Sequence, residues 1–161
     1  MTKLSHVDSG GKARMVDVSG KTPTRRRAVA SGVVTLSKEA FERVRQNSSD
    51  KGDVLGVARI AGICAAKRTS ELIPLCHPVP LDLVELKLEL DAVRRAVLIE
   101  ASALTRSRTG VEMEALTAVA VAGLTVYDMI KAVDRSAVVS EIKLIEKSGG
   151  RSGHYKRPAG G

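Results

Sequence analysis

The sequence has 161 residues, of which 43% are hydrophobic and 27% charged, values typical of a single globular domain with one core. Only 2% of the residues are aromatic, so we expect a core packed from Val, Leu, Ile and Ala. No apolar run approaches the roughly 20 residues that a membrane-spanning helix needs, and the chain does not begin with the apolar region of a signal peptide. These features argue against a membrane protein and favour a soluble, cytoplasmic one.

The net charge of +8 is unevenly distributed along the chain. Residues 1–36 and 147–161 together carry +9, which leaves −1 for the residues between them. Basic segments of this kind suit a polyanionic partner, either a nucleic acid or a small phosphorylated ligand. Proteins that bind single strands usually stack bases on aromatic rings, and this chain has one Phe, two Tyr and no Trp. We therefore expect no specific nucleic-acid partner, and non-specific binding by the basic segments stays open as the alternative.

The predicted elements begin after a polar segment, residues 1–24, that we expect to form a flexible N-terminal arm. Residues 26–36 are small and β-branched, which predicts a strand. Ser37 is a good N-cap for a short helix. Asp53 is a good N-cap for a longer helix, which must end before Pro74.

The second half of the chain predicts a hairpin, a long helix and a last strand. Residues 82–90 alternate between apolar and polar side chains, as in a strand with one buried face, and a turn over 91–95 leads to its partner. Apolar and small residues dominate 111–133, which predicts a helix of about 35 Å. A strand over 137–145 follows. This order indicates an α+β fold, with helices packed on one face of a mainly antiparallel sheet.

Asp128 and Lys131 lie three residues apart on the long predicted helix, among mostly apolar or small residues. An ordinary i,i+3 ion pair explains them when the pair is considered alone. However, a Lys in partly apolar surroundings has its pKa lowered toward neutrality, and a carboxylate beside it can orient it as a general acid or base. Glu114 lies about 21 Å from Asp128 along the helix axis, so one small substrate can touch both only if two subunits build the site.

Residues 73–81 contain three prolines around Cys76 and His77, which predicts a rigid loop that can hold a side chain over a ligand. A structural turn with a buried Cys is the simpler explanation. Because Cys76 and His77 are adjacent and lack the spacing of a metal-ligand pair, we expect no metal site. Glu112 and Glu114 lie in the first turn of the long helix, where favourable contact with the helix dipole explains their carboxylates.

Four segments carry a resemblance to a known family: LSHVDSGGKARMVDVSGK, KGDVLGVARIAGICAAKRTSELIPLCHP, TGVEMEALTAVAVAGLTVYDMIKAVD and LIEKSGGRSGHYK. Together they resemble the cyclic pyranopterin monophosphate synthase family of molybdenum cofactor (molybdopterin) biosynthesis, over about residues 3–156. The resemblance implies a ferredoxin-like fold, which we assign to a single α+β catalytic domain over residues 25–147, with a Gly-rich basic tail over 148–161. It also implies a homohexamer, a trimer of dimers with active sites between subunits.

The resemblance implies a reaction as well. Members of this family are lyases that convert 3',8-cyclo-7,8-dihydro-GTP, supplied by a radical SAM GTP cyclase, into cyclic pyranopterin monophosphate with release of pyrophosphate. A triphosphate substrate gives the basic terminal segments a purpose. The sequence shows no dedicated cluster of metal ligands, so we expect no protein-bound cofactor, although a divalent ion can accompany the substrate phosphates.

By motif, the resemblance implies catalytic roles for Lys51 of KGDV and for Asp128 and Lys131 of DMIKAV, with the lysines as acid and base. The positions that it implies for substrate binding lie in the LCHP and GVEMEA segments: Leu75, Cys76, His77, Glu112, Met113 and Glu114. Basic residues that we expect to contact the triphosphate, on charge and position alone, are Arg26, Lys67, Arg108 and Lys147. Solvated surface charge explains these last four equally well.

Overall fold

The computed structural model describes residues 6–7, 10–47 and 52–158. Within these residues one sheet contains the strands β1 (Thr24–Thr35), β2 (Leu83–Asp91), β3 (Ala96–Ser107), β4 (Val138–Ser148) and β5 (Tyr155–Lys156). All neighbours pair antiparallel, in the order β2-β3-β1-β4-β5. The helices are α1 (Lys38–Arg45), α2 (Val54–Lys67), α3 (Thr69–Leu72) and α4 (Glu112–Ile130). The order of the first four strands, with helices in the connections, is that of a ferredoxin-like fold.

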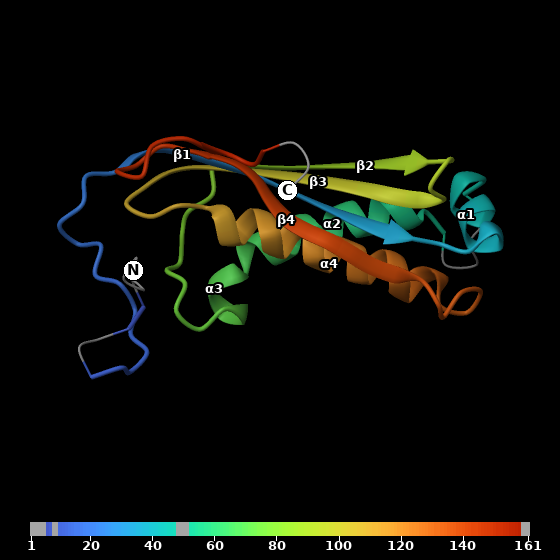
Figure 1. Ribbon diagram of the computed structural model, residues 1–161, viewed down its shortest axis with the longest axis horizontal. Coiled ribbons are helices and arrows are strands. Elements are labelled where there is room, and N and C mark those ends of the chain that lie inside the picture. The colour runs from blue at the N-terminus through green and yellow to red at the C-terminus, as the bar shows by residue number, and fades with distance from the viewer. Residues whose placement is uncertain (1–5, 8–9, 48–51, 159–161) are drawn as a thin grey trace.

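The sheet and the helices form two layers. Figure 1 shows α2 and α4 side by side along one face of the sheet, and no helix of the described residues lies over the other face. The core between the layers is packed mainly from Ala, Val, Leu and Ile, with Phe41 as its aromatic contribution. This arrangement confirms the predicted α+β fold and the predicted aliphatic core.

Most of the predicted elements are confirmed within a few residues. Ser37 and Asp53 cap α1 and α2 with their side-chain oxygens, as the sequence predicts. The prediction of one continuous helix between Asp53 and Pro74 is wrong, because the helix breaks at Arg68 into α2 and α3. The hydroxyl of the buried Thr69 donates to the backbone carbonyl of Ala66 at 3.0 Å, which is the kind of local bond that competes with a continuous helix.

The last predicted strand, over 137–145, is longer in the structure, since β4 continues to Ser148. The chain then turns back, and β5 pairs with the end of β4. Glycines make this turn, because they adopt positive φ without steric cost. These glycines, with their φ angles, are Gly149 (93°), Gly150 (74°) and Gly153 (64°). The first half of the tail is therefore folded back onto the sheet.

Among the described residues, α4 is the helix that is long and apolar enough, by length and composition, to cross a membrane. Its uninterrupted apolar or small stretch is shorter than the whole helix, because Glu112 and Glu114 lie at its start and Asp128 near its end. In addition, 56% of the most apolar part of α4 is buried within the protein, where α4 packs on α2 and on β1, β3 and β4. A helix buried in this way is a core helix.

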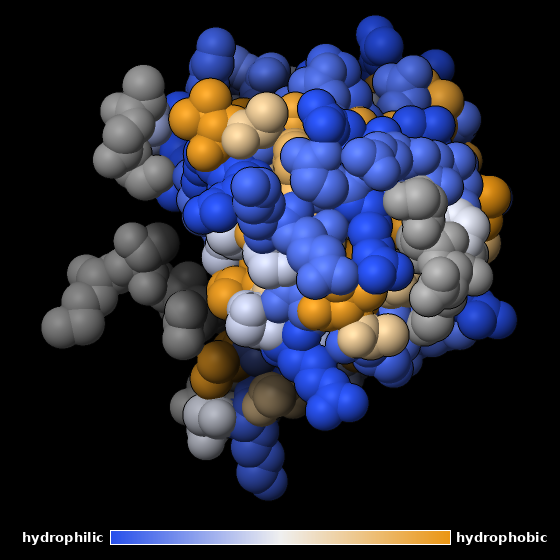
Figure 2. Space-filling model, turned by 90° about the vertical axis from the view of Figure 1, so that its right-hand side faces the viewer, coloured by the Kyte–Doolittle hydropathy of each residue, from blue (hydrophilic) through white to orange (hydrophobic). Residues whose placement is uncertain are grey.

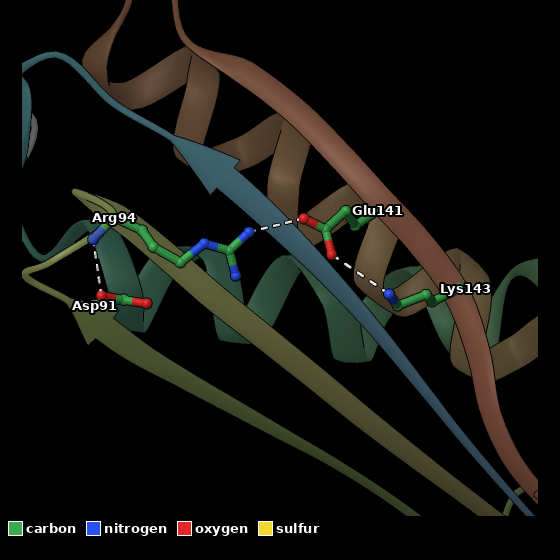
Figure 3. Close-up of polar contacts among 4 residues, drawn as sticks. All are labelled: Asp91, Arg94, Glu141 and Lys143. Atoms are coloured by element: carbon green, nitrogen blue, oxygen red, sulfur yellow. Dashed lines mark hydrogen bonds and ion pairs between the residues drawn. The ribbon is translucent and has the colours of Figure 1, made fainter. Parts of the chain in front are cut away.

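Charged side chains link the strands on the face of the sheet that has no helices (Figure 3). Arg94, in the turn between β2 and β3, donates to Glu141 on β4 at 2.7 Å, and Lys143 donates to the same carboxylate at 3.4 Å. Asp91 accepts a bond from the backbone N–H of Arg94 at 2.9 Å, which fixes the turn. The bonds from Arg94 and Lys143 hold the pKa of Glu141 below its usual value. This network ties the hairpin to β4 across β3 and β1.

Candidate functional site

A pocket of about 230 Å³ lies between the Pro-rich loop after α3 and the first turn of α4. Its lining residues are His6, Leu75, Cys76, His77, Val79, Thr109, Gly110, Glu112, Met113 and Glu114. All the positions for which the family resemblance implies substrate binding are among them, although they come from two segments far apart in the sequence. His6, Val79, Thr109 and Gly110 also line the pocket. They were not among the expected site residues, although His6, Thr109 and Gly110 lie in segments that carry the family resemblance and Val79 lies in the Pro-rich loop.

Glu114 is the most unusual group in this pocket, which we call the Glu114 pocket. Its side chain is buried, with only 4% of the residue exposed. Burial raises the pKa of Glu114 to about 7, and the nearby charge of Glu112 acts in the same direction. A carboxyl with such a pKa exists in both protonation states near neutral pH, so it can donate or accept a hydrogen bond or transfer a proton. Its burial favours a functional role over a simple contact with the helix dipole.

Cys76 lies in the same pocket and stays a neutral thiol. Burial raises its pKa, and the carboxylate of Glu114 raises it further. Since the thiolate is the nucleophilic form of cysteine, Cys76 is a poor nucleophile here. Among the described residues, no group of three His, Cys, Asp or Glu side chains is placed to hold a metal ion.

Asp128 and Lys131 lie at the other end of α4. The Nζ of Lys131 donates to Oδ1 of Asp128 at 2.6 Å, and about half of each side chain is exposed, 53% and 56%. This bond and the charge of Asp128 raise the pKa of Lys131, so the expectation of a lowered pKa is wrong for the single chain. The reason is solvation: within one chain the ammonium lies at the surface, and the end of the molecule to which this part of α4 belongs is largely hydrophilic, with scattered apolar patches (Figure 2).

One chain does not bring these two groups together. Glu114 and Asp128 are separated by about 21 Å along α4, which lies along the sheet and extends toward the side of the molecule that holds α1 (Figure 1). The C-terminal end of α4 lies beside α1, where Asp134 accepts a bond from the backbone N–H of Ser37 at 2.6 Å. Lys51 lies outside the described residues.

The expected triphosphate contacts divide into two pairs. Arg26 and Lys147 line a narrow cleft beside the Glu114 pocket, and the cleft shares Gly110 and Glu112 with that pocket. Lys147 is 3.8 Å from Glu112, between Nζ and Oε1. In contrast, the other two residues, Lys67 at the end of α2 and Arg108 after β3, are exposed and line neither the pocket nor the cleft.

Comparison with known proteins matches residues 15–150 to the MoaC family. The chain belongs to the MoaC family. Cyclic pyranopterin monophosphate synthase of Heliobacterium modesticaldum is 59% identical over 157 residues, which are 98% of this chain and 99% of that protein. The protein of the same name from Thermomicrobium roseum is also 59% identical over 157 residues, covering 98% of this chain and 95% of its own length.

The likeness extends to a larger protein. Molybdenum cofactor biosynthesis protein 1 of Mus musculus is 59% identical over 155 residues, which are 96% of this chain but 24% of that protein. A MoaC-family unit the size of this chain therefore also occurs as one part of a longer protein. These matches confirm the family that the four sequence segments indicate.

Proposed function

We propose that this protein is a lyase of molybdenum cofactor biosynthesis, a cyclic pyranopterin monophosphate synthase. It converts 3',8-cyclo-7,8-dihydro-GTP, the product of a radical SAM GTP cyclase, into cyclic pyranopterin monophosphate and pyrophosphate in the cytoplasm. The observation that carries the proposal is the likeness, over nearly the full length of both chains, to proteins named cyclic pyranopterin monophosphate synthase. The gathering of the expected binding residues around one pocket supports it.

The Glu114 pocket suits the ring system of such a substrate. A guanine-derived ring presents N–H donors beside a carbonyl acceptor, and a carboxyl with a pKa of about 7 can bond to either. Lys51 and Lys131 would move protons during ring opening and closure, with Asp128 orienting Lys131. A hydroxyl of the substrate then attacks the α-phosphorus, and the bond to the bridging oxygen breaks as pyrophosphate leaves. The proposal needs no protein-bound cofactor; any divalent ion would arrive with the substrate phosphates.

A complete site requires a second copy of the chain in this proposal, because Glu114 and Asp128 are too far apart within one chain. The helical layer offers a surface for it. Large apolar side chains are exposed there, Val57 and Ile60 on α2 and Leu124 on α4, with exposed fractions of 44%, 64% and 59%. Exposed apolar side chains on a small domain favour an interface. An antiparallel pairing of α4 with its copy would bring Lys131 of one chain toward Glu114 of the other, and three such pairs would make the homohexamer.

Incubation with 3',8-cyclo-7,8-dihydro-GTP tests the proposed function. We expect stoichiometric release of pyrophosphate, measured by a coupled phosphate assay, and cyclic pyranopterin monophosphate, identified by mass spectrometry. Lys131→Ala should lose this activity. A protein that releases no pyrophosphate from this substrate, but binds oligonucleotides through its basic termini and keeps that binding in Lys131→Ala, is instead a nucleic-acid-binding domain.

Mixing two inactive variants tests whether the site is shared between chains. Lys51→Ala and Lys131→Ala are mixed, unfolded together and refolded, and exchange of subunits is verified with a mass tag. If the two lysines of one site come from different chains, some mixed sites hold both wild-type lysines and activity returns in part. Complete inactivity after proven exchange would show that both lysines of each site come from one chain.

A further inference from the structure

The segment after α4 contains a buried carboxylate. Within the described residues two charged side chains are buried: Glu114, in the first turn of α4, and Asp134, four residues after the helix ends. Only 4% of Asp134 is exposed. A buried carboxylate costs free energy unless hydrogen bonds replace its water. The proposed function gives Asp134 no task, although it lies three residues from Lys131 in the sequence.

Three hydrogen bonds satisfy the carboxylate of Asp134. Its Oδ2 accepts from the backbone N–H of Ser37 at 2.6 Å. Its Oδ1 accepts from the backbone N–H of Ser136 at 2.9 Å and from the hydroxyl of the same residue at 2.7 Å. Burial raises the pKa of Asp134, but the bonds from Ser136 and Ser37 together hold it below its usual value. The group is therefore a charged carboxylate near neutral pH.

The bond to Ser37 joins two parts of the chain that are far apart in the sequence. Ser37 follows β1 and is the N-cap of α1, where its hydroxyl accepts a bond from the backbone N–H of Ala40 at 3.3 Å. Asp134 thus lies at the N-terminus of α1, where the helix dipole favours a negative charge. The carboxylate holds the segment after α4 against the start of α1.

The end of α4 lacks the cap that ends many helices. A helix often stops at a glycine in the left-handed conformation, directly after its C-cap residue. In α4 the C-cap is Lys131, with φ −58° and ψ −22°, and Ala132 follows it. More distant contacts hold this end instead. The hydroxyl of Tyr127 donates to the backbone carbonyl of Arg135 at 3.3 Å, and the carboxylate of Asp134 binds the start of α1.

These contacts lie on both sides of the Asp128–Lys131 pair. Nζ of Lys131 is 2.6 Å from Oδ1 of Asp128, and both side chains are about half exposed. Packing therefore restrains the two side chains little, and their orientation follows that of the backbone. Proton transfer requires close alignment, and a displacement of about 1 Å can cost about 10²-fold in rate. A group that fixes the backbone after Lys131 therefore affects the reaction without touching the substrate.

We propose that Asp134 is a positioning residue, whose carboxylate holds the end of α4 on the start of α1 and so orients Lys131 and Asp128. The inference rests on the proposed function, in which Lys131 transfers a proton, and adds to it a residue outside the substrate site. It also explains why a carboxylate is buried at this position, close to the negative end of the α4 dipole, where an anion is disfavoured.

Substitution of Asp134 by asparagine tests the inference. In Asp134→Asn an amide nitrogen, which cannot accept a hydrogen bond, replaces one oxygen, so the bond to Ser37 or those to Ser136 are lost. We expect kcat to fall about 10²-fold. KM should hardly change, since Asp134 does not contact the substrate. Ser136→Ala removes the hydroxyl bond alone and should lower kcat severalfold, again at unchanged KM.

Asp91→Asn is the matched control. The carboxylate of Asp91 also accepts a backbone N–H, that of Arg94 at 2.9 Å. Its turn lies at the same end of the molecule, because the carbonyl of Arg95 accepts from the backbone N–H of Leu36, the residue before Ser37. The substitution should leave kcat and KM unchanged. Thermal unfolding of all variants shows how far each substitution destabilises the protein.

The reactivity of Lys131 measures its orientation without turnover. The bond to Asp128 raises the pKa of Lys131, so little neutral amine is present at pH 8. If the pair loosens in Asp134→Asn, this pKa falls and acetylation of Lys131 by acetic anhydride, followed by peptide mass spectrometry, becomes severalfold faster. Lys87 is the internal control, because its bond to Glu89 at 2.7 Å raises its pKa in the same way. Its acetylation should not change.

An Asp134→Asn protein that unfolds at a lower temperature but keeps the wild-type kcat and Lys131 reactivity would overturn the inference, because Asp134 would then only stabilise the fold. An equal loss of kcat in Asp91→Asn would also overturn it. If Asp134→Asn does not fold, Ser136→Ala decides, and wild-type kcat and reactivity in that variant would contradict the inference.

The inference and the proposed function fail separately. If wild type does not convert the cyclised dihydro-GTP but Lys131 reacts faster in Asp134→Asn, the link between Asp134 and Lys131 stands and the proposed function fails. If the substrate is converted and Asp134→Asn matches wild type in kcat and in Lys131 reactivity, the positioning role alone fails.

Discussion

At the start of α4 the carboxyl of Glu114 is buried, whereas near its end the carboxyl of Asp128 is about half exposed and paired with Lys131. The same helix therefore holds two acidic groups with opposite electrostatic conditions. Burial raises the pKa of Glu114 to about 7, and at the other end the pair raises the pKa of Lys131. At the start of α4, burial favours the protonated form of Glu114. Near its end, the exposed pair favours the charged forms of Asp128 and Lys131.

The difference comes from what covers each end of α4, since the sequence places acidic residues beside apolar ones at both ends. The Pro-rich loop and the residues just before α4 enclose Glu114. No comparable cover surrounds Asp128 and Lys131 within the described chain, and both side chains reach solvent. In the proposed function the two ends are halves of one site, so each prediction below changes a residue at one end of α4 and measures activity, stability or reactivity.

The largest effect is expected from removal of Lys131. In Lys131→Ala we expect kcat to fall by about 10²–10⁴-fold, the usual loss when a general acid or base is removed. The midpoint of thermal unfolding should hardly move, because the Asp128–Lys131 pair is exposed. Steady-state kinetics and thermal unfolding measured by circular dichroism on the same preparations test both statements.

A matched control for this variant is Arg45→Ala on α1. Arg45 forms an ion pair with Glu42 at the same i,i+3 spacing, with an Nη2–Oε2 distance of 2.5 Å, and is similarly exposed. Its removal should change neither kcat nor the unfolding midpoint appreciably. If Lys131→Ala were as active as Arg45→Ala, the exposed end of α4 would be an ordinary helix surface.

The sequence predicts the fold better than it predicts these environments. Local patterns define β1, the β2–β3 hairpin and α4, since strand alternation, N-caps and helix periodicity depend on neighbouring residues. The break at Arg68 and the pairing of β5 depend on a buried hydroxyl and on Gly-rich turn geometry, which periodicity does not detect.

The candidate site was likewise predicted only in part. Motif resemblance identifies residues that the structure places around one pocket, yet it does not distinguish the buried Glu114 from the exposed Asp128. At about 100° per residue, Glu114 and Asp128 lie within about 40° of each other around the helix axis, but this geometry gives no information on which loop covers that face.

A smaller but clear effect is expected in the pH dependence of stability. The pKa of Glu114 rises from 4.5 to about 7 on folding, so the folded protein binds this proton more tightly than the unfolded chain. The stabilisation is complete below about pH 4.5 and is lost as the pH rises to about 7, by about 3 kcal/mol. Glu114→Gln lacks this titration. Urea unfolding between pH 4.5 and 8 should show the variant becoming more stable relative to wild type as the pH rises.

Glu112→Gln is the control for the pH experiment, because its side chain is only partly buried and lies in the same helical turn. It should keep most of the wild-type pH dependence. The pH range over which stability is lost should end at a slightly lower pH, since the charge of Glu112 contributes to the raised pKa of Glu114. Wild type and Glu114→Gln with parallel pH profiles would show that Glu114 is solvated, and the contrast between the two ends of α4 would disappear.

The smallest effect concerns the reactivity of Cys76, which reports the charge inside the Glu114 pocket. The carboxylate of Glu114 contributes to the raised pKa of this thiol, so Glu114→Gln should lower that pKa and increase the thiolate fraction. In a Cys64→Ser background at pH 8, we expect alkylation of Cys76 by iodoacetamide to become severalfold faster. In a Cys76→Ser background, alkylation of the exposed Cys64 should not respond to Glu114→Gln. An equal acceleration of both thiols would mean that the substitution loosens the protein, whereas an effect confined to Cys76 would require that the charge of Glu114 acts within its own pocket.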